Sequence, residues 1–193
     1  MAKWPNVPAV YGWLTLDRRG QWLIKGERVA NPAIADFIGR NYERDSDGSW
    51  YFQNGPQRVF VELEYTPFVL RAINTAGAPL ELAAHNGAKP HELRSAWLDE
   101  HGSVLLETEL GVGVLDDRDL DVIASVFVDA NGNALDDDGL DRLIDTAQRG
   151  EDPDLWIAYR SARVKVGAVG SSEAARRFGY HASPTAPAGH PEA

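Results

Sequence analysis

The chain has 193 residues, of which 44% are hydrophobic and 25% charged, a composition typical of a folded globular protein rather than a disordered one. It carries 29 Asp and Glu residues against 19 Lys and Arg, and the resulting net charge of −10 argues against binding to nucleic acids or anionic membranes, which repel an acidic protein. It contains no cysteine, which excludes disulfides, thiolate catalysis and cysteine-ligated zinc or iron–sulfur sites.

No segment predicts secretion or membrane insertion. Residues 1–11 contain two prolines and no long apolar run, so they lack the central region of a secretory signal. No other segment reaches the roughly 18 to 20 apolar residues that a membrane helix needs. We therefore expect a cytoplasmic protein.

Turn signals divide the chain at regular intervals. An Asp or Asn followed three residues later by Gly, the pattern preferred at the first and fourth positions of a type I turn, occurs seven times. Two of these patterns, at 36–39 and 136–139, belong to helical segments. The other five predict tight turns between strands, at Asp17–Gly20, Asp45–Gly48, Asn74–Gly77, Asp99–Gly102 and Asp129–Gly132.

Turns and helices recur in the same order in the two halves of the chain. Residues 16–24 align without a gap with residues 98–106, and the turn at 45–48 aligns with the turn at 129–132. Between each pair the sequence predicts one amphipathic helix, the first capped by Asn31 and the second by Asp116. The residues on the apolar faces are Ile34, Phe37, Ile38 and Tyr42 in the first helix and Leu120, Ile123, Ala124 and Phe127 in the second. This order favours a duplicated hairpin-helix-hairpin unit, with chance recurrence as the alternative.

The remaining segments complete an α+β pattern. Residues 50–73 alternate as half-buried strands do, 155–166 also predict a strand, and 140–150 and 172–178 predict helices. We expect an α+β fold of two small domains, each made of antiparallel hairpins packed on one main helix. The domains are expected at 1–88 and 89–179, separated at the connector-like run 84–90, and residues 180–193 are expected to form a flexible tail.

Clusters of acidic residues have two interpretations each. The segment from Glu43 to Asn54 begins like a calcium loop, but its twelfth position is Asn rather than Glu, and turn chemistry explains the same residues. The runs 116–121 and 136–138 could hold a cation, yet acidic residues stabilise a helix start without one. The five histidines lack the spacing of a helical metal site, and no nucleophile, base and oxyanion set is recognisable. We predict no cofactor and no metal site.

The hairpin around Asn54 is the candidate binding site. It combines Trp50, whose ring could stack on a ligand, with the amides of Gln53, Asn54 and Gln57 and the guanidinium of Arg58, which suits a carboxylate or a phosphate. The alternative is structural, because aromatic residues beside a hairpin are commonly cross-strand core and Asn-Gly commonly only a turn.

Several segments resemble those of known proteins. The runs 4–14, 47–59, 67–69 and 113–120 resemble an uncharacterised family of bacterial hypothetical proteins over most of residues 1–180. The pattern Asp17, Gly20, Trp22 and Gly26, with Asp47-Gly48, Trp50 and Pro67-Phe68-Val69, is more distantly similar to a second bacterial family of unknown function. That resemblance implies a two-domain α+β protein built from repeated motifs, with a suggested role in signalling, and it implies no catalytic residues.

The first functional hypothesis is a non-catalytic binding or interaction protein, regulatory or signalling in role. Its partner would be a small polar or anionic ligand, or another protein, held by the cleft between the domains or by the Trp50–Arg58 hairpin. The alternative is a small metal-assisted hydrolase or transferase that uses Asp45, Asp47, Asp116 or Asp119. Self-association through an exposed apolar patch is a third hypothesis.

Overall fold

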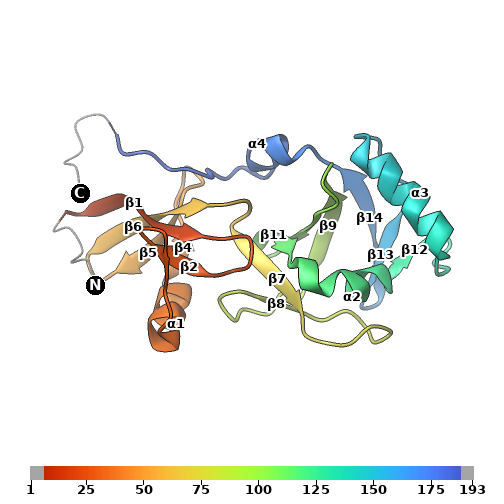
Figure 1. The fold of residues 1–193 in the computed structure, drawn as a ribbon, viewed down its shortest axis with the longest axis horizontal. Helices are drawn as coiled ribbons and strands as arrows, with labels where there is room; N and C mark the ends of the chain where they lie inside the picture. Colours follow the sequence, from red (N-terminus) through yellow and green to blue (C-terminus); the bar gives the residue numbers. More distant parts are fainter. Residues whose placement is uncertain (1–6, 188–193) are drawn as a thin grey trace.

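The computed structural model describes residues 7–187 and contains two β-sheets arranged one after the other along the long axis of the molecule (Figure 1). The first sheet has six strands, in the order β3-β2-β1-β6-β5-β4. Its strands are β1 (Ala9–Leu16), β2 (Trp22–Ile24), β3 (Glu27–Arg28), β4 (Tyr42–Arg44), β5 (Trp50–Asn54) and β6 (Gln57–Leu63).

The second sheet has eight strands, in the order β12-β13-β14-β9-β10-β11-β7-β8. Its strands are β7 (Phe68–Ala72), β8 (Leu82–Ala84), β9 (Leu93–Leu98), β10 (Val104–Thr108), β11 (Gly111–Leu115), β12 (Phe127–Val128), β13 (Trp156–Tyr159) and β14 (Ala162–Ala168). Because β7 and β8 already pair within this sheet, the change from one sheet to the other falls before Phe68, earlier in the chain than residue 88.

Four short α-helices and two single 3-10 turns complete the described chain. The helices are α1 (Pro32–Arg40), α2 (Leu120–Ala124), α3 (Asp137–Gln148) and α4 (Ala174–Phe178), and the 3-10 turns are η1 (Asp117–Asp119) and η2 (Ser171–Glu173). Asn31 caps α1 by accepting a hydrogen bond from the amide of Ala33, as its sequence predicts. None of the helices within residues 7–187 is long and apolar enough to cross a membrane.

The first sheet and six strands of the second share one strand order. Strands β1 to β6 and strands β9 to β14 both run third-second-first-sixth-fifth-fourth across their sheets. In each run the first and sixth strands are parallel, with Leu16 opposite Leu63 and Leu98 opposite Ala168 at corresponding positions. The helix α3 lies between β12 and β13 and has no counterpart in the first run.

Four of the five predicted turns between strands are confirmed; in the fifth region the turn hydrogen bond runs from the amide of Ala78 to the carbonyl of Thr75, one residue later than the predicted Asn74–Gly77 turn. The amides of Gly20, Gly48, Gly102 and Gly132 donate to the carbonyl of the Asp three residues earlier, and all four glycines have positive φ. The φ of Gly48 is +98°, and a Cβ at this position would overlap the carbonyl oxygen of Gly179. The turn at Gly48 therefore requires glycine for two independent reasons.

The expectation that each domain packs its hairpins on one main helix is wrong. The fold is α+β but dominated by strands, and the fully buried side chains come mostly from them. Phe37 of α1 is 43% exposed and Leu120 of α2 is 41% exposed, although the spacing placed both on apolar faces. The second helix ends at Ala124, and the predicted helical residue Phe127 is buried in β12 instead. Helical spacing alone did not distinguish a long helix from a short turn followed by a strand.

The segment after α4 returns to the first sheet. Tyr180 is buried, the amide of His181 donates to the carbonyl of Gly48, and the amide of Leu63 donates to the carbonyl of Ala182. Figure 1 shows this segment running from α4 along the upper side of the first sheet. The predicted tail 180–193 is thus packed at its beginning, and residues 188–193 lie outside the described part of the chain.

Candidate functional site

The predicted binding hairpin is formed by β5 and β6, with Gly55 at positive φ in its turn. The indole ring of Trp50, at the start of β5, points into the protein, where it packs edge-on against Phe68 with ring centroids 5.0 Å apart. Trp50 is 7% exposed and its Nε1 has no hydrogen-bond partner among the described residues. Trp50 therefore does not lie on the same surface as the polar residues of the hairpin.

The polar side chains of the hairpin mostly contact neighbouring residues of the protein. The amide of Gln53 donates to the carbonyl of Gly55 at 2.7 Å, and that of Gln57 donates to the carbonyl of Val7. The guanidinium of Arg58 lies 4.7 Å above the ring centre of Tyr51. Asn54 pairs with Gln57 across the turn. Ligand binding by Trp50, Gln53, Asn54, Gln57 and Arg58 remains a prediction, and the structure brings together only the last four.

A buried aromatic cluster joins the two sheets. It contains Trp22, Tyr42 and Trp50 from the first sheet with Phe68 of β7 in the second sheet and His85, which directly follows β8. Burial lowers the pKa of His85 to about 3. The Nδ1 atom of His85 accepts the amide of Val69 at 3.3 Å, which assigns the proton of the neutral ring to Nε2, and that buried nitrogen has no partner among the described residues.

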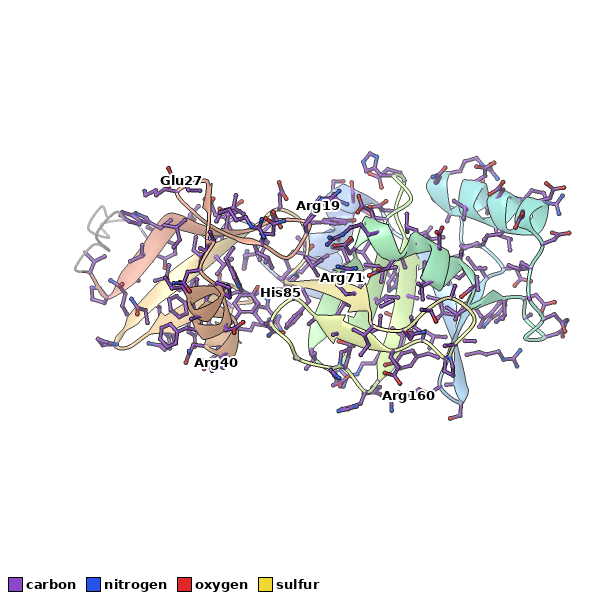
Figure 2. All side chains as sticks on the ribbon, turned by 60° about the horizontal axis from the view of Figure 1, so that its bottom comes forward. Arg19, Glu27, Arg40, Arg71, His85 and Arg160 are labelled. Atoms are coloured by element: carbon purple, nitrogen blue, oxygen red, sulfur yellow. The ribbon has the colours of Figure 1, made fainter. Side chains whose placement is uncertain are left out.

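A cleft of about 420 Å³ lies where the two sheets meet, and we treat it as the candidate site. Two turns in corresponding places in the two strand runs line it, 17–20 between β1 and β2 and 99–102 between β9 and β10. Figure 2 shows Arg19 and His85 in the middle of the molecule, where the sheets meet, whereas Glu27 and Arg40 lie toward one end and Arg160 toward the other. The apolar wall of the cleft is formed by Val114, Leu115 and Leu120.

Arg18 connects the two turns across the cleft. Its Nη2 donates to Ser103 Oγ at 2.8 Å, and its guanidinium lies 4.3 Å above the ring centre of Tyr65. The hydroxyl of Tyr65 donates to the buried carboxylate of Asp99 at 2.8 Å, and burial is the main reason why the pKa of Tyr65 is raised. The position of Arg18 is therefore fixed by contacts with the second sheet.

Arg19 is the more available cation of the cleft. Its Nη2 lies 3.1 Å from a carboxylate oxygen of Asp117, and both side chains are more than half exposed. His101 also lines the cleft, and its imidazole is 67% exposed. Two arginines face one carboxylate in the lining, so the lining has a positive charge within a protein of net charge −10, and His101 lies 3.5 Å from Glu100.

Two buried carboxylates near the cleft are paired with arginines. Arg118 holds Asp116 through Nε and Nη2 at 2.8 and 2.6 Å, and this hydrogen-bonded pair lowers the pKa of Asp116 to about 2. Arg71 holds Asp119 through its own Nε and Nη2, at 2.5 and 3.1 Å. Asp116 and Asp119, two of the carboxylates that the metal-assisted enzyme hypothesis would use, are therefore already paired with arginines.

The other acidic candidates cap their own turn. Asp45 accepts the amides of Asp47 and Ser49 at 3.2 and 3.0 Å, and Asp47 accepts the amide of Ser49 at 2.8 Å. Among residues 7–187 no group of three or more His, Cys, Asp or Glu side chains is arranged to hold a metal ion. The calcium interpretation of this loop gains no support from the positions of its side chains.

A cleft between the domains is expected from the sequence, but none of the residues that line it were predicted as site residues. The polar lining comes from two distant segments, Arg18 and Arg19 in one and His101 and Ser103 in the other, and Arg18 and Ser103 are 85 positions apart. None of these four residues is itself a defining residue of a local motif. The signal that could have found them is the gapless alignment of 16–24 with 98–106. It places two corresponding turns in the two halves, and in the fold these turns face each other.

The chain is similar to proteins of unknown function. The model of the DUF2944 family, which carries the description "Protein of unknown function (DUF2946)", matches residues 1–185. A solved structure of a DUF1285 family protein from Silicibacter pomeroyi DSS-3 superposes with a TM-score of 0.55 at 16% identity, covering 86% of this chain and 84% of that one. A second, from Shewanella baltica OS155, gives a TM-score of 0.41 at 20% identity, covering 55% and 85%. The first similarity supports the fold alone, and no curated protein matches.

Proposed function

We propose, for a chain that belongs to the DUF2944 family of proteins of unknown function, that the cleft between its two sheets binds a small organic anion without transforming it. The observation that carries the proposal is the cleft itself: about 420 Å³ with two arginines at one side and an apolar wall at the other. A cavity of this size fits a metabolite-sized ligand. A carboxylate or phosphate group would pair with the arginines, and the carbon skeleton would contact Leu120.

The contacts of the arginines suggest different roles in binding. Arg18 is held by Tyr65 and Ser103, so its charge is preorganised. Ligand binding therefore loses little side-chain entropy in ordering Arg18. Arg19 is held only by an exposed ion pair with Asp117, which contributes little because water screens it. A ligand anion could replace Asp117 as the partner of Arg19 at small cost.

A ligand in this cleft would contact both halves of the protein at once. We propose that the two strand runs derive from a duplicated unit, which their shared strand order and parallel register support. The domains predicted at 1–88 and 89–179 stay a proposal, with the difference that β7 and β8 before residue 88 belong to the second sheet. A cytoplasmic location is likewise the proposed setting. Binding that stabilises one arrangement of the two halves is the simplest way in which such a protein could act in regulation.

Thermal unfolding with a panel of carboxylates and phosphate esters tests the proposal. A ligand present at about 100 times its dissociation constant adds roughly 2.7 kcal/mol, which raises the Tm of a protein of this size by about 5 to 10 °C. The variant Arg19→Gln should lose most of this shift, whereas Arg40→Gln, on α1 and away from the cleft, should keep it. If no anion shifts the Tm, or if both variants respond alike, the cleft is not the site.

A further inference from the structure

The second sheet carries a groove on one face, separate from the cleft between the sheets. It has a volume of about 660 Å³ and follows β9 and β14, lined by residues 92–97 and 162–167 of these parallel strands. At about 3.3 Å per residue, six residues of strand give the groove a length of about 20 Å. It is therefore long and shallow rather than enclosed.

Cations occupy alternate positions of β14 in the lining of this groove. Arg163 and Lys165 are exposed, whereas Val166 beside them is fully buried, as the alternation of side chains along a strand requires. The two cations are two positions apart on one face, so their Cα atoms are about 6.6 Å apart. Arg94 contributes a third cation from β9.

The carboxylates that line the groove are already engaged. Glu92 pairs with Arg94 at 3.1 Å, and Asp152 accepts the amide of Ala168 at 2.9 Å. Arg163 donates to the carbonyl of Ala130, and the ammonium of Lys165 lies 5.8 Å from the ring centre of Trp156. Within residues 7–187 neither Arg163 nor Lys165 forms an ion pair with a carboxylate, so no carboxylate neutralises either charge, although Arg163 would have to share its guanidinium between Ala130 and a partner.

Trp97 also lines the groove. Its ring covers Gly167, where any side chain would overlap it, and the guanidinium of Arg177 lies 3.7 Å from the ring centre. The edges of the sheet are at β12 and β8, and β9 pairs with β14 over residues 96–98 and 166–168. The proposal therefore rests on the side chains of the groove and not on a free sheet edge.

We propose that this groove binds an acidic segment of another protein in an extended conformation. In an extended peptide alternate side chains repeat every 6.6 to 7 Å or so, which matches the spacing of Arg163 and Lys165. Acidic side chains at alternate positions would therefore meet both cations in register. A nucleic acid carries one negative charge per phosphate along its whole length, so the net charge of −10 of the chain repels it more strongly than a short segment with a few carboxylates.

The test uses the full chain and a fluorescein-labelled hexapeptide of alternating glutamate and threonine, measured by fluorescence anisotropy. We expect wild type to bind it at least about tenfold more tightly than the double variant R163E/K165E, because charge reversal replaces attraction with repulsion. The matched control R28E/R40E changes the net charge equally but lies on the first half of the molecule, and its affinity should stay within about twofold of wild type. A peptide with glutamine in place of glutamate should bind to neither.

Three results would overturn the proposal. The first is no binding of the glutamate peptide to wild type, or equal loss in the two double variants. The second is tighter binding of a single-stranded oligonucleotide of the same charge, lost in R163E/K165E, which would make the groove a nucleic-acid site. The third is a monomer–dimer equilibrium in sedimentation that the same variant abolishes, which would make a second copy the occupant. If R163E/K165E unfolds, R163Q/K165Q takes its place, with an unchanged Tm as the requirement.

Discussion

His85 should make the protein less stable in mild acid. Its imidazole is buried in the aromatic cluster with a pKa of about 3, against 6.5 in an unfolded chain. Below pH 6.5 the imidazole is therefore protonated in the unfolded chain but stays neutral in the folded protein, and the free energy of unfolding decreases as pH falls toward 3. Between pH 7 and pH 4.5 this difference amounts to about 2.5 kcal/mol, since each pH unit below 6.5 costs about 1.4 kcal/mol.

Urea unfolding followed by tryptophan fluorescence at the two pH values measures this effect. The variant His85→Gln keeps an acceptor for the amide of Val69 but does not titrate, so it should lose about 2.5 kcal/mol less than wild type over the same interval. Carboxylates contribute equally to both proteins and cancel in the comparison. His91→Gln, which removes an exposed imidazole, serves as the control. The same pH dependence in wild type and His85→Gln would refute the reasoning.

Three further predictions concern the turn at Gly48, the pair at Asp116 and the hairpin. Gly48→Ala should lower the free energy of unfolding by at least about 1 kcal/mol more than Gly55→Ala does. Both sites have positive φ, but only at Gly48 would the added Cβ overlap another part of the protein, the carbonyl oxygen of Gly179; equal melting temperatures would contradict this. Asp116→Asn should destabilise the protein by about 1 to 2 kcal/mol at pH 7 because it weakens the pair with Arg118. The lowered pKa of Asp116 means that this difference should shrink as pH falls from about 4 toward 2, and a constant difference in chemical denaturation would argue against the pair. Arg58→Ala should change stability by less than about 0.5 kcal/mol, and calorimetric loss of anion binding in this variant would move the site from the cleft to the hairpin.

Local features of the fold were predictable from sequence. The turns at Gly20, Gly48, Gly102 and Gly132 follow from an Asp side chain capping nearby amides and a glycine that accepts positive φ, and both groups lie within four residues. The start of α1 at Asn31 and the end of α4 at Gly179 are equally local.

Long-range features were not predictable in the same way. The run 155–166 predicts one strand, but the structure divides it at Arg160, a non-glycine residue with φ of +54° that carries no turn signal. The parallel pairing of β1 with β6 joins residues 47 positions apart, for example Leu14 and Val61, and nothing local specifies it. The cleft depends on this pairing and on its counterpart, so its residues could be found only after the sheets were known.

The return of residues 180–182 to the first sheet bears on how the protein is made. The strands of that sheet are complete once Leu63 has been synthesised, yet the amide of Leu63 bonds to Ala182, which follows 119 positions later. At a translation rate of about 5 to 20 residues per second, this interval lasts roughly 6 to 24 s. During that time the turn at Gly48 lacks its contact with the returning segment, so the growing chain exposes a surface that the finished protein covers. The translation speed between Leu63 and Ala182 thus sets how long the first sheet must stay folded on the ribosome without the contacts of residues 180–182.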